Sequence, residues 1–239
     1  MTTPILPSRP VVAITGCRRG LGRALAQEFA AAGATVIAHA RTQAQAEEVA
    51  RGLTSPGIPV GGDVRDRELG LRIAAAAEPH EGVDLLILNA GILGTMGALA
   101  DASCDEFAEV MDINVTAQVA LVQATAPGMV TRGRGAVIWL SSGLGRFGVP
   151  GYGAYCASKH AVEGLMKILA EEHGADGLVS VAMAPGMVQT DMLRVALGTA
   201  DVSAHQTPEA TARGFVAFAR DLSAEHNGQS LDIEGWMPG

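Results

Sequence analysis

The sequence predicts an α/β, doubly wound fold: a single domain built on a parallel β-sheet with helices on both faces. Short apolar runs rich in β-forming residues alternate with longer helical patterns along the 239 residues, which is the rhythm of βαβ units. The inner runs, such as 83–88 (VDLLIL) and 136–140 (AVIWL), are continuously apolar, as strands buried on both faces are. No internal repeat or linker interrupts this pattern, and the length suits one domain with a large core.

The expected strands are short apolar segments separated by helical stretches. They comprise residues 11–15, 35–39, 85–88, 136–140, 179–183 and 230–233. After the first strand, Leu21, Leu25 and Phe29 recur every four residues and predict a helix, with Gly33 as its C-terminal cap. Two later helices carry apolar stripes that predict core or subunit contacts: Val162, Leu165, Met166, Leu169, Phe215, Phe218 and Leu222.

Two segments lie outside this alternation. Residues 1–9 lack a basic stretch followed by a long apolar one, so we expect a short flexible tail and no secretory signal. Residues 191–207 form the longest irregular stretch and are our candidate for a substrate lid, with an ordinary short helix as the alternative reading. Its apolar side chains are Met192, Leu193, Val195 and Leu197.

Composition excludes several classes of protein. The net charge is −8 and basic residues do not alternate with aromatic ones, so nucleic acid is not an expected partner. Cys17, Cys104 and Cys156 are too scattered for a disulfide framework or a zinc site, and the six histidines show no ligand spacing, so we expect no metal. No window of about 18 apolar residues occurs. We therefore expect a soluble, cytoplasmic protein with no membrane partner.

Ser142, Tyr155 and Lys159 form the pattern S-x12-Y-x3-K, which indicates hydride transfer on a carbonyl or alcohol. A tyrosine phenol has an ordinary pKa of about 10 and needs a neighbouring charge to exchange protons near neutral pH. Residues four apart share one face of a helix, so the Lys159 ammonium can supply that charge to Tyr155. Ser142 would reach the same volume from another segment.

Three neighbours of these residues could be mistaken for them. Tyr152 has no lysine four positions on and is expected to line the pocket instead. Ser141 neighbours Ser142 and is expected to be a structural hydroxyl. Cys156 has no histidine placed to activate it, so we expect a buried apolar thiol rather than a nucleophile.

A glycine-rich turn follows the first strand and predicts a dinucleotide site. In Thr15-Gly16-Cys17-Arg18-Arg19-Gly20-Leu21-Gly22 the glycines Gly16, Gly20 and Gly22 let backbone amides and a helix N-terminus face a pyrophosphate. At the end of the second strand, where an acidic residue would select NAD, the chain has Ala40 and Arg41. Arg18, Arg19 and Arg41 could pair with a 2′-phosphate, which favours NADP(H); the alternative is that they are solvated surface charges.

Together these motifs resemble the short-chain dehydrogenase/reductase family, in its compact rather than extended branch, over nearly the whole chain. Further matches are Asp63-Val64, Asn89-Ala90-Gly91, Asn114, and Pro185-Gly186 with Thr190 three residues after Met187. Leu88 stands where the family's NNAG element has its first asparagine, and the last strand runs Asp232-Ile-Glu-Gly235-Trp236 where Asp-Gly-Gly is common. The resemblance implies a Rossmann-type fold of about seven parallel strands.

The resemblance also implies roles for these residues. Tyr155 would be the proton donor in reduction, Lys159 would lower its pKa and hold ribose hydroxyls, and Ser142 would bind the substrate oxygen. Asn114 would kink its helix and hold a water that links Lys159 to solvent. Cofactor contacts are then expected at Thr15, Gly16, Arg18, Arg19, Gly20, Leu21, Gly22, Arg41, Asp63, Val64, Asn89, Ala90, Gly91, Tyr155, Lys159, Pro185, Gly186, Val188 and Thr190.

The leading hypothesis is an NADPH-dependent reductase that converts a ketone to a secondary alcohol reversibly. The alternatives are a 3-oxoacyl-thioester reductase and, from another class, a non-catalytic NADP-binding sensor or assembly subunit. Expected pocket residues are Leu93, Met96, Leu144, Val149, Tyr152, Met187, Met192 and Leu193, which favours an apolar substrate. Arg146 and Arg194 are candidate anchors for an anionic group. Trp236 is expected to cover a pocket or to pack at a subunit interface, and relatives imply a homotetramer, with a dimer second.

Overall fold

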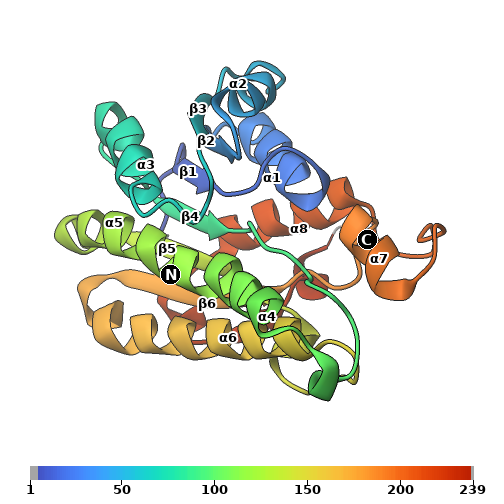
Figure 1. The fold of residues 1–239 in the computed structure, drawn as a ribbon. Helices are drawn as coiled ribbons and strands as arrows, with labels where there is room; N and C mark the ends of the chain where they lie inside the picture. The colour runs from blue at the N-terminus through green and yellow to red at the C-terminus, as the bar shows by residue number, and fades with distance from the viewer. Residues whose placement is uncertain (1–4, 238–239) are drawn as a thin grey trace.

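The protein is described by a computed structural model that covers residues 5–237, in which seven parallel strands form one sheet (Figure 1). The strand order is β3-β2-β1-β4-β5-β6-β7. The strands are β1 Val11–Ile14, β2 Thr35–Ala40, β3 Ile58–Gly61, β4 Leu85–Leu88, β5 Gly135–Leu140, β6 Leu178–Ala184 and β7 Ser230–Asp232. The order reverses between β1 and β4, the switch point at which doubly wound sheets bind ligands. The predicted fold class is confirmed.

The continuously apolar strands are explained by the two cores that they separate. Side chains of one parity, such as Ile14 and Ile138, pack with helices α1 (Gly20–Ala31) and α8 (Pro208–Asp221). Side chains of the other parity, such as Leu86, pack with α3 (Leu69–Ala77), α5 (Ala117–Arg132) and α6 (Gly153–His173). In Figure 1, α1 and α8 accordingly lie on one side of the sheet and α5 and α6 on the other. Burial on both faces explains why these strands do not alternate with polar residues.

The predicted helical stripes face these cores. Phe215, Phe218 and Leu222 are buried with α1, while Val162, Met166 and Leu169 of α6 are buried on the opposite face. The first helix ends as expected near Gly33, which has φ +93° one residue after the C-cap Ala32. The amides of Gly33 and Ala34 bond the carbonyls of Ala30 and Phe29, which is a Schellman motif.

Strand β3 is the one strand whose position the sequence pattern did not indicate. Its four residues, Ile58–Gly61, include Pro59, and only Val60 among them is buried. A proline cannot donate a hydrogen bond to a second neighbour, so it is tolerated because β3 is the edge of the sheet, paired with β2 alone. An edge strand needs neither continuous apolar character nor a full set of amide donors, and it is therefore hard to recognise from sequence.

The remaining helices complete the carboxyl edge of the sheet. Helix α2 (Gln43–Arg51) follows β2, and α4 (Cys104–Met111) runs through a π-helical stretch, Asp112–Thr116, into α5. Asn114 lies in that π-helical stretch, where the family resemblance implied a kink. Among residues 5–237, no helix is long and apolar enough to cross a membrane.

The two segments expected outside the alternation are more ordered than predicted. The candidate lid begins with a helix, α7 (Asp191–Leu197), so the alternative reading of a short helix holds for its first part. The Gln206 amide donates to the Met187 carbonyl. The end of the segment therefore lies beside the residues that follow β6. Residues 1–4 of the expected tail lie outside the described residues. For Ile5 and Leu6 the expectation of a flexible tail is corrected. Both pack against the core beside α1 and α8, because they are apolar and lie next to β1.

Candidate active site

The predicted site segments all follow carboxyl ends of the central strands. The glycine-rich turn follows β1, Asn89-Ala90-Gly91 follows β4, the Ser142 turn follows β5 and the Pro185 segment follows β6. Because the strands are parallel and adjacent, these ends meet along one edge of the sheet. The sequence motifs, dispersed over 175 positions between Thr15 and Thr190, therefore lie in one region.

The glycine-rich turn needs its glycines for two different reasons. Gly16 and Gly20 have φ +75° and +55°, which L residues with a side chain rarely adopt. At Gly22 the constraint is space, because a Cβ there would lie 2.3 Å from the Gly16 oxygen and 2.4 Å from Asn89 Nδ2. The turn is thus built for close approach of its own backbone to the segment after β4.

Thr15 and Asn89 join the turn to that neighbouring segment. The backbone amides of Asn89 and Ala90 both donate to Thr15 Oγ1 at 3.0 Å, and Asn89 Nδ2 donates to the Thr15 carbonyl at 2.7 Å. Two loops from adjacent strands are therefore held in a fixed relation at the switch point of the sheet.

The start of α1 has the features of an anion site. Arg19 occupies the N-cap position in an extended conformation and makes no capping hydrogen bond with its side chain. The first amides of a 12-residue helix therefore receive no side-chain cap from this residue, and a helix N-terminus favours phosphate. A pyrophosphate suits this turn, since the positive-φ backbone at Gly16 and Gly20 leads into the helix whose first amides lack a side-chain cap.

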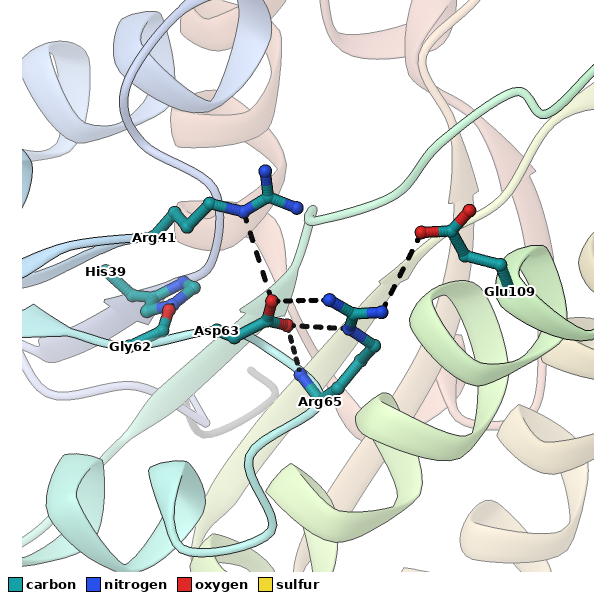
Figure 2. A network of polar contacts seen from close by, with 6 residues as sticks. All are labelled: His39, Arg41, Gly62, Asp63, Arg65 and Glu109. Carbon is teal, nitrogen blue, oxygen red and sulfur yellow. Dashed lines mark hydrogen bonds and ion pairs between the residues drawn. The ribbon is translucent and has the colours of Figure 1, made fainter. Parts of the chain in front are cut away.

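The expected adenine-binding residue, Asp63, is held by an arginine that the sequence analysis did not single out. Arg65 Nε and Nη2 donate to the two Asp63 carboxylate oxygens at 3.0 and 2.8 Å, and the Arg65 backbone amide donates to Oδ1 at 3.0 Å (Figure 2). These bonds hold the pKa of the Asp63 carboxyl well below its usual range. Glu109 lies 3.7 Å from Arg65 on its other side. Val64 packs against the α3–α5 core.

The three arginines expected near a 2′-phosphate differ in their surroundings. Arg41 is exposed, and its Nε lies 4.0 Å from Asp63 Oδ2, as the dashed line in Figure 2 marks. Arg19 pairs with Asp191 at 2.9 Å, so it joins the glycine-rich turn to the start of α7. Arg18 is exposed. Exposed pairs of this kind contribute little to stability, so the guanidinium groups can be recruited by a ligand at low cost.

The Ser142, Tyr155 and Lys159 side chains come together next to this edge. Ser142 is the N-cap of a short 3-10 turn, Gly143–Gly145, and its hydroxyl accepts a bond from the Leu144 amide at 3.2 Å. Lys159 is buried, with its Nζ 5.5 Å from the centroid of the Tyr155 ring, and donates to the Leu140 carbonyl at 2.6 Å. The lysine therefore links the helix of the tyrosine to the strand that ends before the serine.

Burial shifts the pKa values of the tyrosine and the lysine toward their neutral forms. It raises the pKa of Tyr155 to about 12, opposed by contact with the Ser142 hydroxyl. It lowers the pKa of Lys159 to about 8, opposed by the nearby Glu163 carboxylate. At neutral pH the site therefore holds a protonated phenol beside a lysine that still carries its charge but titrates just above neutrality.

Ser141 and Cys156, the alternatives to the predicted residues, have other environments. Ser141 is buried and donates to Glu163 Oε1 at 2.5 Å, so its hydroxyl fastens the end of β5 to α6. Cys156 is buried with a free thiol.

Asn114 is completely buried and supports the segment after β4. Its Oδ1 accepts from the Ile92 amide at 2.8 Å, and its Nδ2 donates to the Ile92 carbonyl at 2.9 Å and to Ser158 Oγ at 3.0 Å. Ser158 in turn donates to the Tyr155 carbonyl at 2.7 Å. The side chain thus connects the loop after β4 to the helix that carries the tyrosine and lysine.

The expected pocket residues lie around the opening of this region with different exposures. Tyr152 donates its hydroxyl to the Ala196 carbonyl of α7 at 2.5 Å, and Gly97 donates its amide to the Gly151 carbonyl at 3.0 Å. The loop after β4, the start of α6 and α7 therefore meet. Leu93, Leu144, Val149 and Leu193 are half-buried, whereas Met96, Met187 and Met192 are exposed.

The two candidate anchors, Arg146 and Arg194, both have partners within the chain. Arg146 bonds Ser230 Oγ, the Leu231 carbonyl and Asp232 at 2.7 to 3.0 Å, because β7 returns beside the turn after β5. Arg194 bonds Asp191 and the Ala200 carbonyl within its own segment. Both are engaged inside the chain.

Trp236 packs edge-on against Phe218 of α8, with ring centroids 4.8 Å apart. Its Nε1 donates to Asp221 at 3.0 Å. Its half-buried ring therefore packs beside α8, and the expected contact with a second subunit stays a prediction.

Three further residues at the site escaped sequence reasoning: His39, Arg65 and Glu163. Arg65 and Glu163 carried a usable signal, since Arg65 lies two residues after Asp63 and Glu163 lies one helical turn after Lys159. His39 carried no signal, because its partners lie 23 residues away in both directions along the chain.

Known proteins of one family resemble this chain over most of its length. Residues 10–199 match the family model of the short chain dehydrogenases. The NADPH-dependent pterin aldehyde reductase of Arabidopsis thaliana is 35% identical, over 96% of this chain and 95% of that protein. The 3alpha-hydroxysteroid dehydrogenase of Mediterraneibacter gnavus is 30% identical, over 94% and 95%. A solved Escherichia coli structure complexed with NADPH is 29% identical with a TM-score of 0.86, over 96% and 98%. The chain therefore belongs to the short chain dehydrogenase family.

Proposed function

We propose that this protein is an NADPH-dependent oxidoreductase that reduces a ketone or aldehyde to an alcohol, reversibly. The observation that carries the proposal is the group formed by Ser142, Tyr155 and Lys159 beside a glycine-rich turn that suits a pyrophosphate. Asn114, which connects the loop after β4 to α6, completes the proposed set of catalytic residues.

NADP(H) as cofactor is supported by charge and by relatives. Arg41 is exposed at the end of β2, where an acidic residue would repel a 2′-phosphate, and Arg19 is exposed at the start of α1. The Arabidopsis relative is named for its NADPH dependence, and the Escherichia coli structure is complexed with NADPH. Asp63 would bind the adenine and Asn89-Ala90-Gly91 would border it. Pro185, Gly186, Val188 and Thr190 would contact the nicotinamide carboxamide.

The proposed mechanism assigns one task to each side chain. When bound, NADPH supplies the hydride. Tyr155 holds its proton at neutral pH, as its raised pKa requires, and gives it to the substrate oxygen. Ser142 donates a hydrogen bond to that oxygen, whose negative charge grows during reduction. The buried Lys159 ammonium stabilises the phenolate that remains.

The substrate is proposed to be an apolar carbonyl compound. Six apolar residues of α7, of the segment before it and of the segment after β4 are exposed: Met96, Leu99, Met187, Met192, Val195 and Leu197. A 3-oxoacyl thioester with a phosphopantetheine arm is the second candidate. Of its candidate anchors, Arg146 is engaged by three groups of β7, whereas Arg194 forms an exposed pair with Asp191 of the same kind as that of Arg19.

Residues 191–207 are proposed to cover the substrate as a lid. The contacts that hold the segment include the bond from Tyr152 to Ala196, the ion pair of Arg19 with Asp191 and the bond from the Gln206 amide to Met187. The proposed assembly is a homotetramer. Light scattering on the purified protein would test it by measuring the molar mass of the assembly.

The test of the proposed reaction is a substrate panel with Tyr155→Phe as the decisive variant. Oxidation of NADPH at 340 nm is expected with apolar cyclic ketones and aromatic aldehydes. Tyr155→Phe should abolish turnover and retain NADPH affinity, because it removes one hydroxyl and keeps the ring. Substantial turnover by this variant would exclude Tyr155 as the proton donor, and no turnover by the wild type with any carbonyl would exclude the reaction.

The test of the cofactor preference is Arg41→Asp. Loss of a charge-assisted contact to the 2′-phosphate should lower kcat/KM for NADPH by roughly tenfold to a hundredfold, while the value for NADH is kept or improved. Arg51→Asp makes the same charge change on the exposed side of α2 and serves as the matched control. An equal effect of both variants would argue against a specific role for Arg41.

A further inference from the structure

His39 is a buried histidine that the proposed mechanism does not use. It lies next to the last residue of β2, is 3% exposed, and its ring reaches the loops on both sides of that strand. Figure 2 shows it beside Gly62, close to the Asp63 and Arg65 pair. A buried imidazole with two partners in two loops of a ligand site calls for a physical explanation.

The partners of the ring determine its protonation state. The Gly16 amide lies 3.2 Å from Nδ1 and can only donate, so Nδ1 must be an acceptor. The Gly62 carbonyl lies 2.9 Å from Nε2 and can only accept, so Nε2 must carry the proton. Both bonds exist together only in the neutral Nε2–H tautomer.

The two bonded residues belong to the two halves of the expected nucleotide site. Gly16 opens the glycine-rich turn with its φ of +75°, and Gly62 directly precedes Asp63. The His39 carbonyl also accepts from the Cys17 amide at 2.8 Å, so the residue holds the turn through both its backbone and its side chain. One residue therefore sets the distance between the pyrophosphate turn and the adenine loop.

We propose that His39 is a positioning residue for the cofactor, which as the neutral Nε2–H imidazole holds the Gly16 amide and the Gly62 carbonyl in the arrangement that binds the dinucleotide. The inference rests on the proposed NADP(H) binding. It adds that the cofactor site is correctly arranged only while His39 is neutral, and acid pH removes that state. Protonation would place a hydrogen on Nδ1 facing the Gly16 amide hydrogen, so the bond to the glycine-rich turn would be lost.

The groups around the His39 ring determine the pH below which its bond to the Gly16 amide is lost. Burial lowers the pKa of His39 below its ordinary value of 6.5, and the Arg72 guanidinium of α3 acts in the same direction. The Gly62 carbonyl and the Asp63 carboxylate oppose them. Cys17, whose amide bonds the His39 carbonyl, stays neutral because burial raises the pKa of its thiol to about 12. Binding should therefore weaken below pH 6.5 and not above it.

Two substitutions separate the two bonds. The amide of His39→Asn lies near the Nδ1 position and can accept from Gly16, whereas that of His39→Gln lies near the Nε2 position and can donate only to Gly62. Titration of the purified full-length variants with NADPH at pH 8, followed by fluorescence, should give His39→Asn a Kd within about threefold of wild type. His39→Gln should bind at least about tenfold more weakly, since it leaves the Gly16 amide without an acceptor. Equal affinities of the two variants would overturn the proposal.

The pH dependence is the second readout. Between pH 8 and 5.5 the 2′-phosphate also titrates, with a pKa near 6, but equally for every variant. The ratio of wild-type to His39→Asn affinity should therefore isolate the histidine and fall toward pH 5.5, by no more than about tenfold because the pKa of His39 lies below 6.5. A ratio that rises toward acid pH would overturn the proposal.

Two measurements on the protein without cofactor separate this inference from the proposed function. Nitrogen-15 NMR of the wild-type imidazole should show an unprotonated Nδ1 and a protonated Nε2, and a ring protonated on Nδ1 would overturn the proposal even if NADPH is turned over. Hydrogen exchange of the Gly16 amide should be at least tenfold faster in His39→Gln than in His39→Asn. If His39→Gln does not fold, the wild-type tautomer and the pH ratio still decide. Failure of the wild type to bind NADPH would instead refute the proposed function.

Discussion

Replacing Asn114 by alanine gives the most direct test of the connection between the loop after β4 and α6. The side chain is 0% exposed and makes three hydrogen bonds of 2.8 to 3.0 Å, two to the backbone of Ile92 and one to Ser158. Alanine removes all three and leaves the amide and carbonyl of Ile92 without these partners. Asn114→Ala should therefore destabilise the protein before any effect on catalysis is considered.

The magnitude follows from the number of bonds. At about 1 kcal/mol net for each hydrogen bond, the loss comes to roughly 3 kcal/mol, and the unsatisfied groups at Ile92 act in the same direction. For a chain of this size, about 2–4 °C of melting temperature corresponds to 1 kcal/mol. We expect the melting temperature of Asn114→Ala to fall by roughly 6–12 °C.

Gln118→Ala is the matched control in urea and thermal unfolding. Gln118 is also buried, one turn further along, and contacts the same loop through one long bond of 3.5 Å to the Ala90 carbonyl. Its Oε1 has no partner among residues 5–237. Alanine removes more atoms from Gln118 than from Asn114, so packing alone would make the control the more damaging change. The reasoning fails if Gln118→Ala costs as much as Asn114→Ala, or if Asn114→Ala lies within 1 kcal/mol of wild type.

Two further predictions concern the glycine-rich turn and the lysine. Gly22→Ala should lower the free energy of unfolding in urea by about 1–3 kcal/mol, because the new Cβ meets the Gly16 oxygen and Asn89. It should also weaken NADPH binding, measured by fluorescence. In the control Gly128→Ala the new Cβ meets only the end of the Arg132 side chain, so this variant should raise the free energy of unfolding by about 0.5–1 kcal/mol. A Gly22→Ala protein with wild-type affinity would contradict the close approach. The steady-state reduction rate at saturating NADPH should fall as pH rises through about 8, where Lys159 loses its charge, and a flat profile from pH 7 to 9.5 would contradict that role.

Much of the fold could be predicted because its determinants are local in sequence. Apolar runs such as Leu85–Leu88 are continuous because they lie between two cores, and Gly33 marks the end of α1 through a backbone conformation that favours glycine. Strand β3 was not located, because an edge strand with Pro59 needs neither property. Ile5 and Leu6 were assigned to a tail because two apolar residues form no pattern, although they pack against the core.

Some features of the candidate site could likewise be predicted from the sequence, and others could not. The spacing of Ser142, Tyr155 and Lys159 was readable, because two of them share a helix face and the third follows a strand that a parallel sheet brings alongside. The ion pair of Arg146 with Asp232 could not be predicted from the sequence, since the two residues are 86 positions apart. Arg146 was a candidate substrate anchor in the sequence and is a structural residue in the fold.

By itself the sequence determined the doubly wound class, the glycine-rich turn and the identity of the candidate catalytic residues. These depend on backbone conformation and on periodicity, which neighbouring residues encode. Only the tertiary structure decided which charged and polar groups pair: Arg65 with Asp63, Arg19 with Asp191, Glu163 with Ser141, and His39 with both Gly16 and Gly62. The physical reason is that a hydrogen bond or ion pair acts over about 3 Å in space, and which groups come that close depends on how the strands are ordered in the sheet.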